Sequence, residues 1–257
     1  MPALSNKAVI GVSFKLYLSR GETRDWCRRA GDIARAHPAV AGGDIELVIF
    51  PTLPAMETSM AAVGEVPVAF GAQDLFWEDR GAYTGAISGA DLADMGARYA
   101  EIGHAERRAV FGETDGVIAR KVAAAVRSGL TPWLCIGEPE AGDAETAAAF
   151  CLAQLEASLA ALDTATDLVV AYEPVWAIGQ AEAADPAHIR HVAQALAARL
   201  ADDSRITHAR VVYGGSAQVG TLATLHGAVD GLFLGRFAHD TTAFAAMLDE
   251  AAAMIAD

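Results

Sequence analysis

Residues 168–179 read Leu168-Val-Val-Ala-Tyr-Glu-Pro-Val-Trp-Ala-Ile-Gly179. The first five are apolar or aromatic, which is typical of a strand in a parallel sheet that is buried on both faces. Glu173 ends this strand, and Pro174 starts a loop with a stiff first residue and a glycine at its far end. A carboxylate at a strand end, under a loop that excludes water, is suited to act as a general base. An acid that simply begins a loop is the structural alternative.

Short apolar runs alternate along the chain with longer segments rich in Ala, Arg, Glu and Asp. The apolar runs predict strands near residues 8–15, 45–50, 67–72, 99–103, 131–136, 167–173, 210–214 and 229–234. The other segments predict helices near 22–37, 54–62, 90–97, 115–128, 144–162, 186–202, 217–225 and 241–256, with Asp185, Asp143 and Asp115 as candidate N-terminal caps. Eight strand–helix units in 257 residues match the α/β class and its closed (β/α)8 TIM barrel.

We expect one barrel domain over residues 1–257, because no Pro/Gly/Ser-rich linker divides the chain. A doubly wound open sheet is the competing architecture. It would need a glycine-rich dinucleotide fingerprint after an early strand, and the sequence contains none. A phosphate-binding P-loop pattern is missing as well.

Composition narrows the partners and the compartment. The formal net charge is -14, and no Lys/Arg stripe is present, so we expect no nucleic-acid partner. The apolar runs are short and broken by charges, which predicts no membrane span. Three cysteines without zinc-like spacing, and an N-terminus without signal-peptide character, favour a cytoplasmic protein. The histidines also lack metal-ligand spacing, so we expect no metal.

Polar residues and glycine turns gather where the predicted strands end. They are Lys15 at the end of the first strand, His104 after the fourth, Glu173 at the end of the sixth, Gly214-Gly-Ser216 after the seventh and Gly235 at the end of the eighth. In a closed parallel barrel these ends meet at one rim, where the active sites of this architecture lie. The sequence therefore predicts a single site at that rim.

Each candidate side chain has a functional and a structural interpretation. Burial should raise the pKa of Glu173. His104 begins a helix whose dipole disfavours a charged ring, so a neutral imidazole could donate a hydrogen bond to a carbonyl; a satisfied structural histidine is the alternative. Lys15 is an ammonium on an apolar strand and needs a partner, for which Glu106 is the candidate. That pair could be purely structural, or it could present a positive charge to an oxyanion.

Two glycine turns predict a phosphate site. Tyr213-Gly-Gly-Ser-Ala217 and Leu234-Gly235 lead into helices, and backbone N–H groups at such turns can bind phosphate without a cation. Each turn alone is often only a tight turn. Barrels frequently place a phosphate site after strands seven and eight, which favours the functional interpretation.

Six segments together resemble the triosephosphate isomerase family. They are Gly71-Ala-Gln73, Gly81-Ala-Tyr-Thr-Gly85, Gly103-His-Ala-Glu-Arg-Arg108, Cys135-Ile-Gly-Glu138, Ala171-Tyr-Glu-Pro-Val-Trp-Ala-Ile-Gly179 and Tyr213-Gly-Gly-Ser216. The resemblance spans most of the chain and implies a (β/α)8 barrel that needs no cofactor. It implies Glu173 as base, His104 as electrophile and Lys15 as electrostatic anchor, with Glu106 in support.

The same resemblance implies the remaining parts of the site. Gly179, Ser216 and Gly235 would contact the substrate phosphate. A closing lid would contain Pro174, Val175, Trp176, Ala177 and Ile178, with Tyr213 as its latch. The family is usually homodimeric, and Thr84 would then lie near Lys15 of the neighbouring subunit.

Departures from the family pattern concern the substrate. Ser13 stands where the family typically has an asparagine that contacts the substrate near its carbonyl, and Ala105 replaces a serine. Arg236 follows Gly235 in place of a second glycine, which adds a cation near the phosphate. Gln180-Ala-Glu182 replaces the usual Thr-Gly-Lys at the far end of the lid.

These departures are similar to the L-erythrulose-1-phosphate isomerase branch of the family. That branch moves the carbonyl of a tetrulose phosphate from carbon 2 to carbon 3 through an enediolate, giving D-erythrulose 4-phosphate. Loss of the asparagine side chain could make room for the extra hydroxymethyl group. A glycolytic triosephosphate isomerase is the alternative. A non-catalytic sugar-phosphate-binding barrel is a third hypothesis, which the intact Lys15, His104 and Glu173 disfavour.

Overall fold

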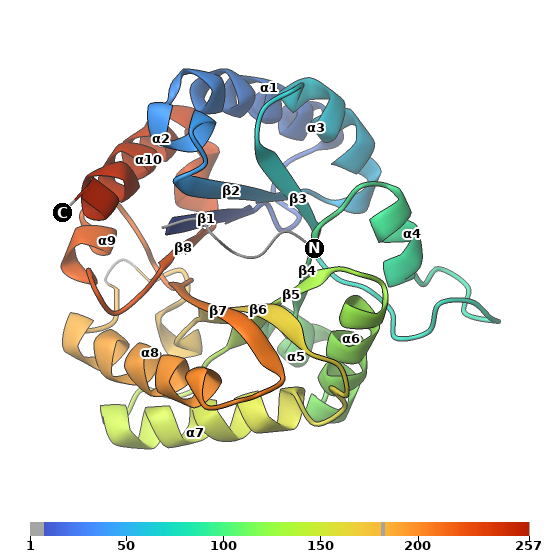
Figure 1. Ribbon diagram of the computed structural model, residues 1–257, viewed down its shortest axis with the longest axis vertical. Coiled ribbons are helices and arrows are strands. Elements are labelled where there is room, and N and C mark those ends of the chain that lie inside the picture. The colour runs from blue at the N-terminus through green and yellow to red at the C-terminus, as the bar shows by residue number, and fades with distance from the viewer. Residues whose placement is uncertain (1–7, 181–182, 257) are drawn as a thin grey trace.

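Eight parallel strands close into a barrel in the computed structural model, which describes residues 8–180 and 183–256 (Figure 1). Their order around the barrel is their order along the chain. The strands are β1 (Ala8–Ser13), β2 (Ile45–Phe50), β3 (Val68–Ala72), β4 (Tyr99–Ile102), β5 (Thr131–Ile136), β6 (Thr166–Tyr172), β7 (Ile206–Tyr213) and β8 (Gly231–Leu234). The predicted fold class and strands are confirmed, although β7 begins earlier than residue 210.

Helices form a ring outside the strands (Figure 1). They are α1 (Arg20–Ala36), α2 (Pro38–Ala41), α3 (Met56–Val63), α4 (Gly89–Asp94), α5 (Ala105–Phe111), α6 (Asp115–Arg127), α7 (Ala144–Ser158), α8 (Pro186–Ala201), α9 (Thr221–Thr224) and α10 (Thr241–Ala256). Shorter 3-10 turns occur at η1 (Leu53–Ala55), η2 (Val175–Ala177) and η3 (Arg236–His239). Short α2 was not predicted, and α9 covers only part of the predicted 217–225.

Side chains cap the N-termini of several of these helices. Of the three aspartates predicted as caps, two have this role. Asp185 accepts a hydrogen bond from the Ala187 amide at 2.7 Å, and Asp143 accepts one from the Thr146 amide at 2.9 Å. The prediction for Asp115 was wrong. Asp115 is the first residue of α6, and the side chain of the preceding threonine is the cap.

Closure of the barrel depends on the contact between β8 and β1. Val9 is paired with Gly231 in this parallel ladder. A Cβ atom on Gly231 would come within 1.7 Å of the Val9 carbonyl oxygen, so only glycine allows the two backbones to approach this closely.

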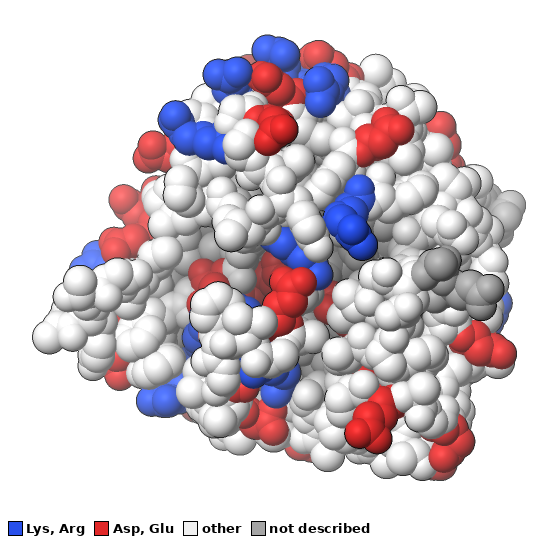
Figure 2. Space-filling model, turned by 180° about the vertical axis from the view of Figure 1, so that it is seen from behind, with Lys and Arg blue, Asp and Glu red and all other residues white. Residues whose placement is uncertain are grey.

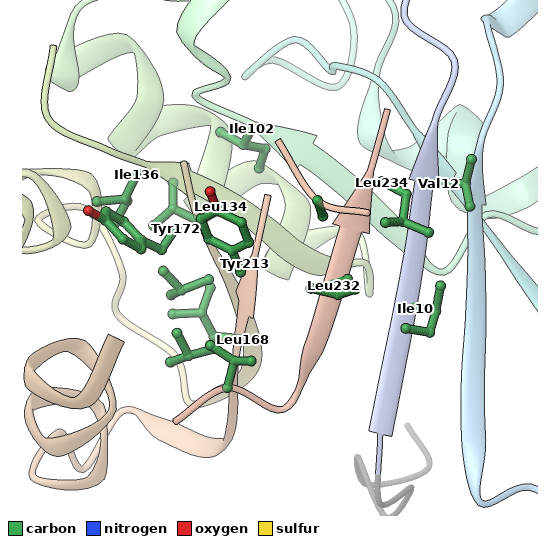
Figure 3. Close-up of a cluster of buried hydrophobic side chains, with 14 of the residues drawn as sticks. Ile10, Val12, Ile102, Leu134, Ile136, Leu168, Tyr172, Tyr213, Leu232 and Leu234 are labelled. Carbon is green, nitrogen blue, oxygen red and sulfur yellow. The ribbon is translucent and has the colours of Figure 1, made fainter. Parts of the chain in front are cut away.

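Apolar side chains form two layers, because successive strand residues point to opposite faces. One layer fills the barrel interior and includes Val9, Phe50, Tyr99, Trp133 and Phe233. The other packs between the strands and the helices. Figure 3 shows part of this outer layer, with Ile10, Val12, Ile102, Leu134, Ile136, Leu168, Tyr172, Tyr213, Leu232 and Leu234 labelled. Both layers hold the strands rigidly, so the carboxyl ends of the strands have fixed positions.

Across residues 8–180 and 183–256, no helix has both the length and the apolar character needed to cross a membrane. Over the same ranges, no three His, Cys, Asp or Glu side chains are grouped in a way that could hold a metal ion.

Candidate active site

A cavity of about 640 Å³ opens at the carboxyl ends of the strands. Figure 2 shows the hollow near the centre of this face, where acidic and basic side chains gather. The cavity brings together most residues that the sequence predicts for the site: Ser13, Lys15, His104, Glu106, Glu173, Ile178, Gly179, Ser216, Gly235 and Arg236. Segments distant in sequence therefore meet at one rim.

Glu173 lies directly beyond β6 and is 3% exposed. Burial raises the pKa of this carboxyl to about 8, and the negative charge of the buried Glu101 contributes to the rise. Gly214 makes room for the carboxylate, since a Cβ there would lie 2.7 Å from the Glu173 Oε1 atom. The expected rise in pKa is confirmed in direction, although the contribution of Glu101 was not expected.

His104 caps α5 with its own ring. Its Nδ1 atom accepts a hydrogen bond from the Glu106 amide at 3.1 Å, so a neutral ring carries its proton on Nε2. The Nε2 atom lies 3.3 Å from Oε2 of Glu173. Burial and the positive charge of Lys15 lower the pKa of His104 to about 4. The ring is therefore neutral as predicted, with burial as the leading cause rather than the helix dipole considered above.

Lys15 reaches into the same cavity from the loop after β1. Its Nζ atom is 2.8 Å from Oε1 of Glu106, which is the expected ion pair. Burial pulls the pKa of Lys15 down, but the hydrogen bond and charge of Glu106, with help from Glu173, raise it overall. The backbone of Lys15 is left-handed, with φ of 48°, and it is the sole non-glycine residue with positive φ in the described ranges. Such strain is often found where a side chain must be aimed at a ligand.

The predicted phosphate residues lie on the β7, β8 and lid side of the cavity. The Ser216 hydroxyl donates to the carbonyl oxygens of Ala177 and Gln180, at 2.8 and 3.1 Å, so it holds the lid segment in this structure. Arg236 stacks over Tyr17, with its guanidinium carbon 5.5 Å from the ring centroid. The loops after β7 and β8 thus present backbone amides and one cation to the same space.

The predicted lid begins with Pro174 and continues through η2. Trp176 Nε1 donates to Oε1 of Glu138 at 2.7 Å, and the Tyr172 hydroxyl lies 3.2 Å from both oxygens of that carboxylate. His188 Nε2 is a further neighbour of Glu138 at 3.2 Å. Glu138 therefore holds Trp176 and α8 to the end of β5. Gln180 is described, whereas Ala181 and Glu182 of the predicted lid end lie outside the described residues.

Tyr213, the predicted latch, is fully buried at the end of β7. Burial raises the pKa of its hydroxyl to about 12. Thr84 is exposed and belongs to the segment between β3 and α4, which projects from the barrel (Figure 1).

Sequence reasoning missed one acid at the site. Glu101 is on β4, is 4% exposed, and accepts a hydrogen bond from the Ser13 hydroxyl at 2.9 Å. Ser13 was expected to support the site and to leave space, and its hydroxyl also forms this hydrogen bond with Glu101. A single acid between apolar residues in Tyr99-Ala-Glu-Ile102 was the signal that could have revealed this pair.

Comparison with known proteins agrees with this geometry. The family model described as triosephosphate isomerase matches residues 8–251. An L-erythrulose-1-phosphate isomerase of Pectobacterium atrosepticum is 49% identical over 96% of this chain and 96% of that protein. A triosephosphate isomerase of Leifsonia xyli subsp. xyli is 43% identical over 80% of this chain and 83% of its own length. Another, from Moorella thermoacetica, is 38% identical over 95% and 98% of the two chains.

Proposed function

The chain belongs to the triosephosphate isomerase family and is a sugar phosphate isomerase, and we propose that it converts L-erythrulose 1-phosphate to D-erythrulose 4-phosphate. The observation that carries the chemistry is the buried pair of Glu173 and a neutral His104, 3.3 Å apart at the mouth of the barrel. The loss of the family's asparagine at Ser13, together with the 49% identity to a relative of that name, supports the choice of a tetrulose phosphate.

In this mechanism Glu173 removes the proton from carbon 3, next to the carbonyl at carbon 2. The electron pair of the C–H bond forms the carbon 2–carbon 3 double bond, and the carbonyl oxygen becomes an oxyanion. His104 donates its Nε2 proton to that oxygen and accepts the proton of the neighbouring hydroxyl, while Lys15 supplies positive charge. Glu173 then returns a proton to carbon 2. Base catalysis contributes about 10²–10⁴-fold and one oxyanion donor about 10²–10³-fold in such sites.

Protonation states in the structure suit these roles. Glu173 with a pKa of about 8 is a strong enough base to take a carbon-bound proton, yet it ionises at accessible pH. His104 stays neutral far below that pH, so it can both donate and accept a proton. Lys15 keeps its charge, because its pKa is raised.

Phosphate binding would occur at Gly179, Ser216, Gly235 and Arg236, opposite the reacting carbons. Ser216 already links the β7 loop to the lid through two lid carbonyls. Closure of the lid segment Pro174–Gly179 over the phosphate would exclude water from the enediolate, which can otherwise eliminate phosphate. Binding energy from the non-reacting end of the substrate is in this way used to organise the reacting end.

We also propose an oligomeric state and a cellular location for the protein. We place the protein in the cytoplasm as a single-domain subunit of a homodimer, with Thr84 near Lys15 of the partner subunit. Exposed apolar side chains support a dimer: Leu16 next to Lys15 is 89% exposed, Phe111 on α5 is 65% exposed and Tyr83 next to Thr84 is 46% exposed. Leu16 and Phe111 line the same cavity, and large exposed apolar surfaces of this kind mark protein interfaces.

Glycolytic triosephosphate isomerase activity is the second candidate, because relatives of that name reach 43% identity. Side-by-side measurement of kcat/KM on L-erythrulose 1-phosphate and on glyceraldehyde 3-phosphate separates the two. The proposal predicts the higher value for the tetrulose phosphate. An equal or higher value for the triose phosphate would overturn it. A protein that binds both and turns over neither would be a binding protein instead.

A further inference from the structure

Glu101 is a buried carboxylate that the mechanism above does not use. Its side chain points to the barrel interior, because it lies two residues beyond Tyr99, which is part of the interior layer. Within the described parts of the chain, no Lys or Arg forms an ion pair with Glu101. The nearby Lys15 is instead engaged by Glu106. Burial of a carboxylate without a cation is costly for folding, so its presence in a strand calls for a functional explanation.

One oxygen of Glu101 is occupied and the other is available. The Ser13 hydroxyl donates to Oε2 at 2.9 Å. Among the described residues, 8–180 and 183–256, no side chain or backbone group donates a hydrogen bond to Oε1 of Glu101. Ser13 thus fixes the rotamer of the carboxylate and leaves its second oxygen for a ligand.

The position of Glu101 indicates which part of a ligand it would meet. It lines a second cavity of about 750 Å³, which shares Ser13, Lys15, His104 and Glu106 with the cavity described above. The predicted phosphate residues belong only to the first cavity, on the side of β7 and β8. Because β4 lies across the barrel from β8, Glu101 is on the opposite side of the barrel from the predicted phosphate residue Gly235.

A tetrulose phosphate that spans this site has a defined direction. Its phosphate lies at the β7–β8 loops, its carbons 2 and 3 lie at Glu173 and His104, and its carbon 4 extends beyond them. From this geometry we infer that Glu101, held by Ser13, binds the terminal hydroxyl of the substrate and selects four-carbon over three-carbon sugar phosphates. The inference rests on the proposed function, since a triose phosphate has no such group.

The chemistry of the pair suits a hydroxyl ligand. Burial raises the pKa of Glu101 to about 8, while the Ser13 hydrogen bond and the charge of Lys15 oppose the rise. A hydroxyl can both donate and accept, so it pairs with Glu101 whether that side chain is ionised or neutral. A purely apolar wall at this place would leave the hydroxyl of the substrate unpaired and buried.

A positioning or electrostatic role for Glu101 would give a different result from a specificity role. The charge of Glu101 raises the pKa of Glu173, and that influence acts on every substrate alike. Direct recognition of the terminal hydroxyl acts only on substrates that carry it. The ratio of kcat/KM for L-erythrulose 1-phosphate to kcat/KM for glyceraldehyde 3-phosphate therefore separates the two roles.

The experiment compares wild type with Glu101→Leu, which removes both oxygens, and Glu101→Gln, which keeps the shape and one acceptor. We expect the ratio to fall about 10- to 100-fold in Glu101→Leu and less in Glu101→Gln, as for the loss of a hydrogen bond to a charged group. Glu46→Gln is the matched control. Glu46 is also buried but lies on β2, paired with the Tyr99 hydroxyl at 2.7 Å, and its variant should keep the wild-type ratio.

A second measurement does not depend on whether the Glu101→Leu variant folds. Wild type should use the 4-deoxy analogue of L-erythrulose 1-phosphate about 10- to 100-fold less well than the substrate, and Glu101→Gln should discriminate less. An unchanged ratio in the variants, or equal use of the analogue by wild type, would overturn the inference even if wild type prefers the tetrulose. A wild type that prefers the triose phosphate would instead overturn the proposed function.

Discussion

Shortening the base by one methylene tests the geometry of the site. In Glu173→Asp the carboxylate withdraws by about 1.5 Å, the length of one C–C bond. The separation of 3.3 Å between Oε2 and His104 Nε2 would then widen, and the base would no longer reach the carbon that His104 and Lys15 position. A misplacement of about 1 Å can cost about 10²-fold in rate, so we expect kcat to fall about 10²- to 10³-fold.

The phosphate contacts are untouched by this change, so KM should vary little. Stability should fall by about 1 kcal/mol, as for the loss of one buried methylene. Steady-state kinetics together with urea unfolding measure both quantities. Glu46→Asp is the control, because it makes the same change in a buried carboxylate on β2, away from the cavity. Wild-type kcat in a folded Glu173→Asp protein would remove Glu173 from the mechanism.

Other parts of the account make independent predictions. The kcat/KM of the free enzyme should rise with pH to a midpoint near 8, because Glu173 must lose a proton bound with a pKa of about 8; a midpoint near the ordinary carboxyl pKa would show that the base is not desolvated. Arg236→Ala should raise KM about tenfold or more with a smaller change in kcat, through loss of one charge-assisted contact to phosphate; an unchanged KM would place the phosphate elsewhere. Trp176→Phe removes the 2.7 Å hydrogen bond to Glu138 that anchors the lid, so the enediolate should be exposed to water more often. A larger share of turnovers should then eliminate inorganic phosphate. An unchanged share would mean that this hydrogen bond does not control closure of the lid. In the folded protein the pKa of Glu101 is raised to about 8, so the stabilisation linked to this shift is full at low pH and is lost as pH rises through 8. Between pH 6 and 9 the unfolding free energy of Glu101→Gln should therefore fall less than that of wild type. Parallel curves of unfolding free energy against pH would contradict the raised pKa.

Local signals were enough to predict the barrel and the three central side chains. Apolar strands that end in Lys15, His104 or Glu173 can meet only at one rim once the barrel closes, so strand order alone brought them together. The Lys15–Glu106 ion pair was predictable for a similar reason, because a charge on an apolar strand needs a partner.

Contacts that depend on register and rotamer were not predictable. Ser13 and Glu101 are 88 residues apart, and their hydrogen bond depends on how β1 faces β4 across the barrel interior. Glu138 gathers Trp176 and His188 only because the lid and α8 fold over the end of β5. At α6, Thr114 and Asp115 are both favourable caps, and only the backbone conformation decides between them.

Transfer of a carbon-bound proton by Glu173 is the central claim, and conversion in D2O tests it most directly. Wild type should form D-erythrulose 4-phosphate that carries solvent deuterium on its carbon 3, which is carbon 2 of the substrate, and NMR detects this label. Glu173→Gln should neither form product nor exchange the proton on carbon 3 of the substrate. Product formation by Glu173→Gln at the wild-type rate, or wild-type exchange of the carbon-bound proton in that variant, would contradict the assignment of Glu173 as the base.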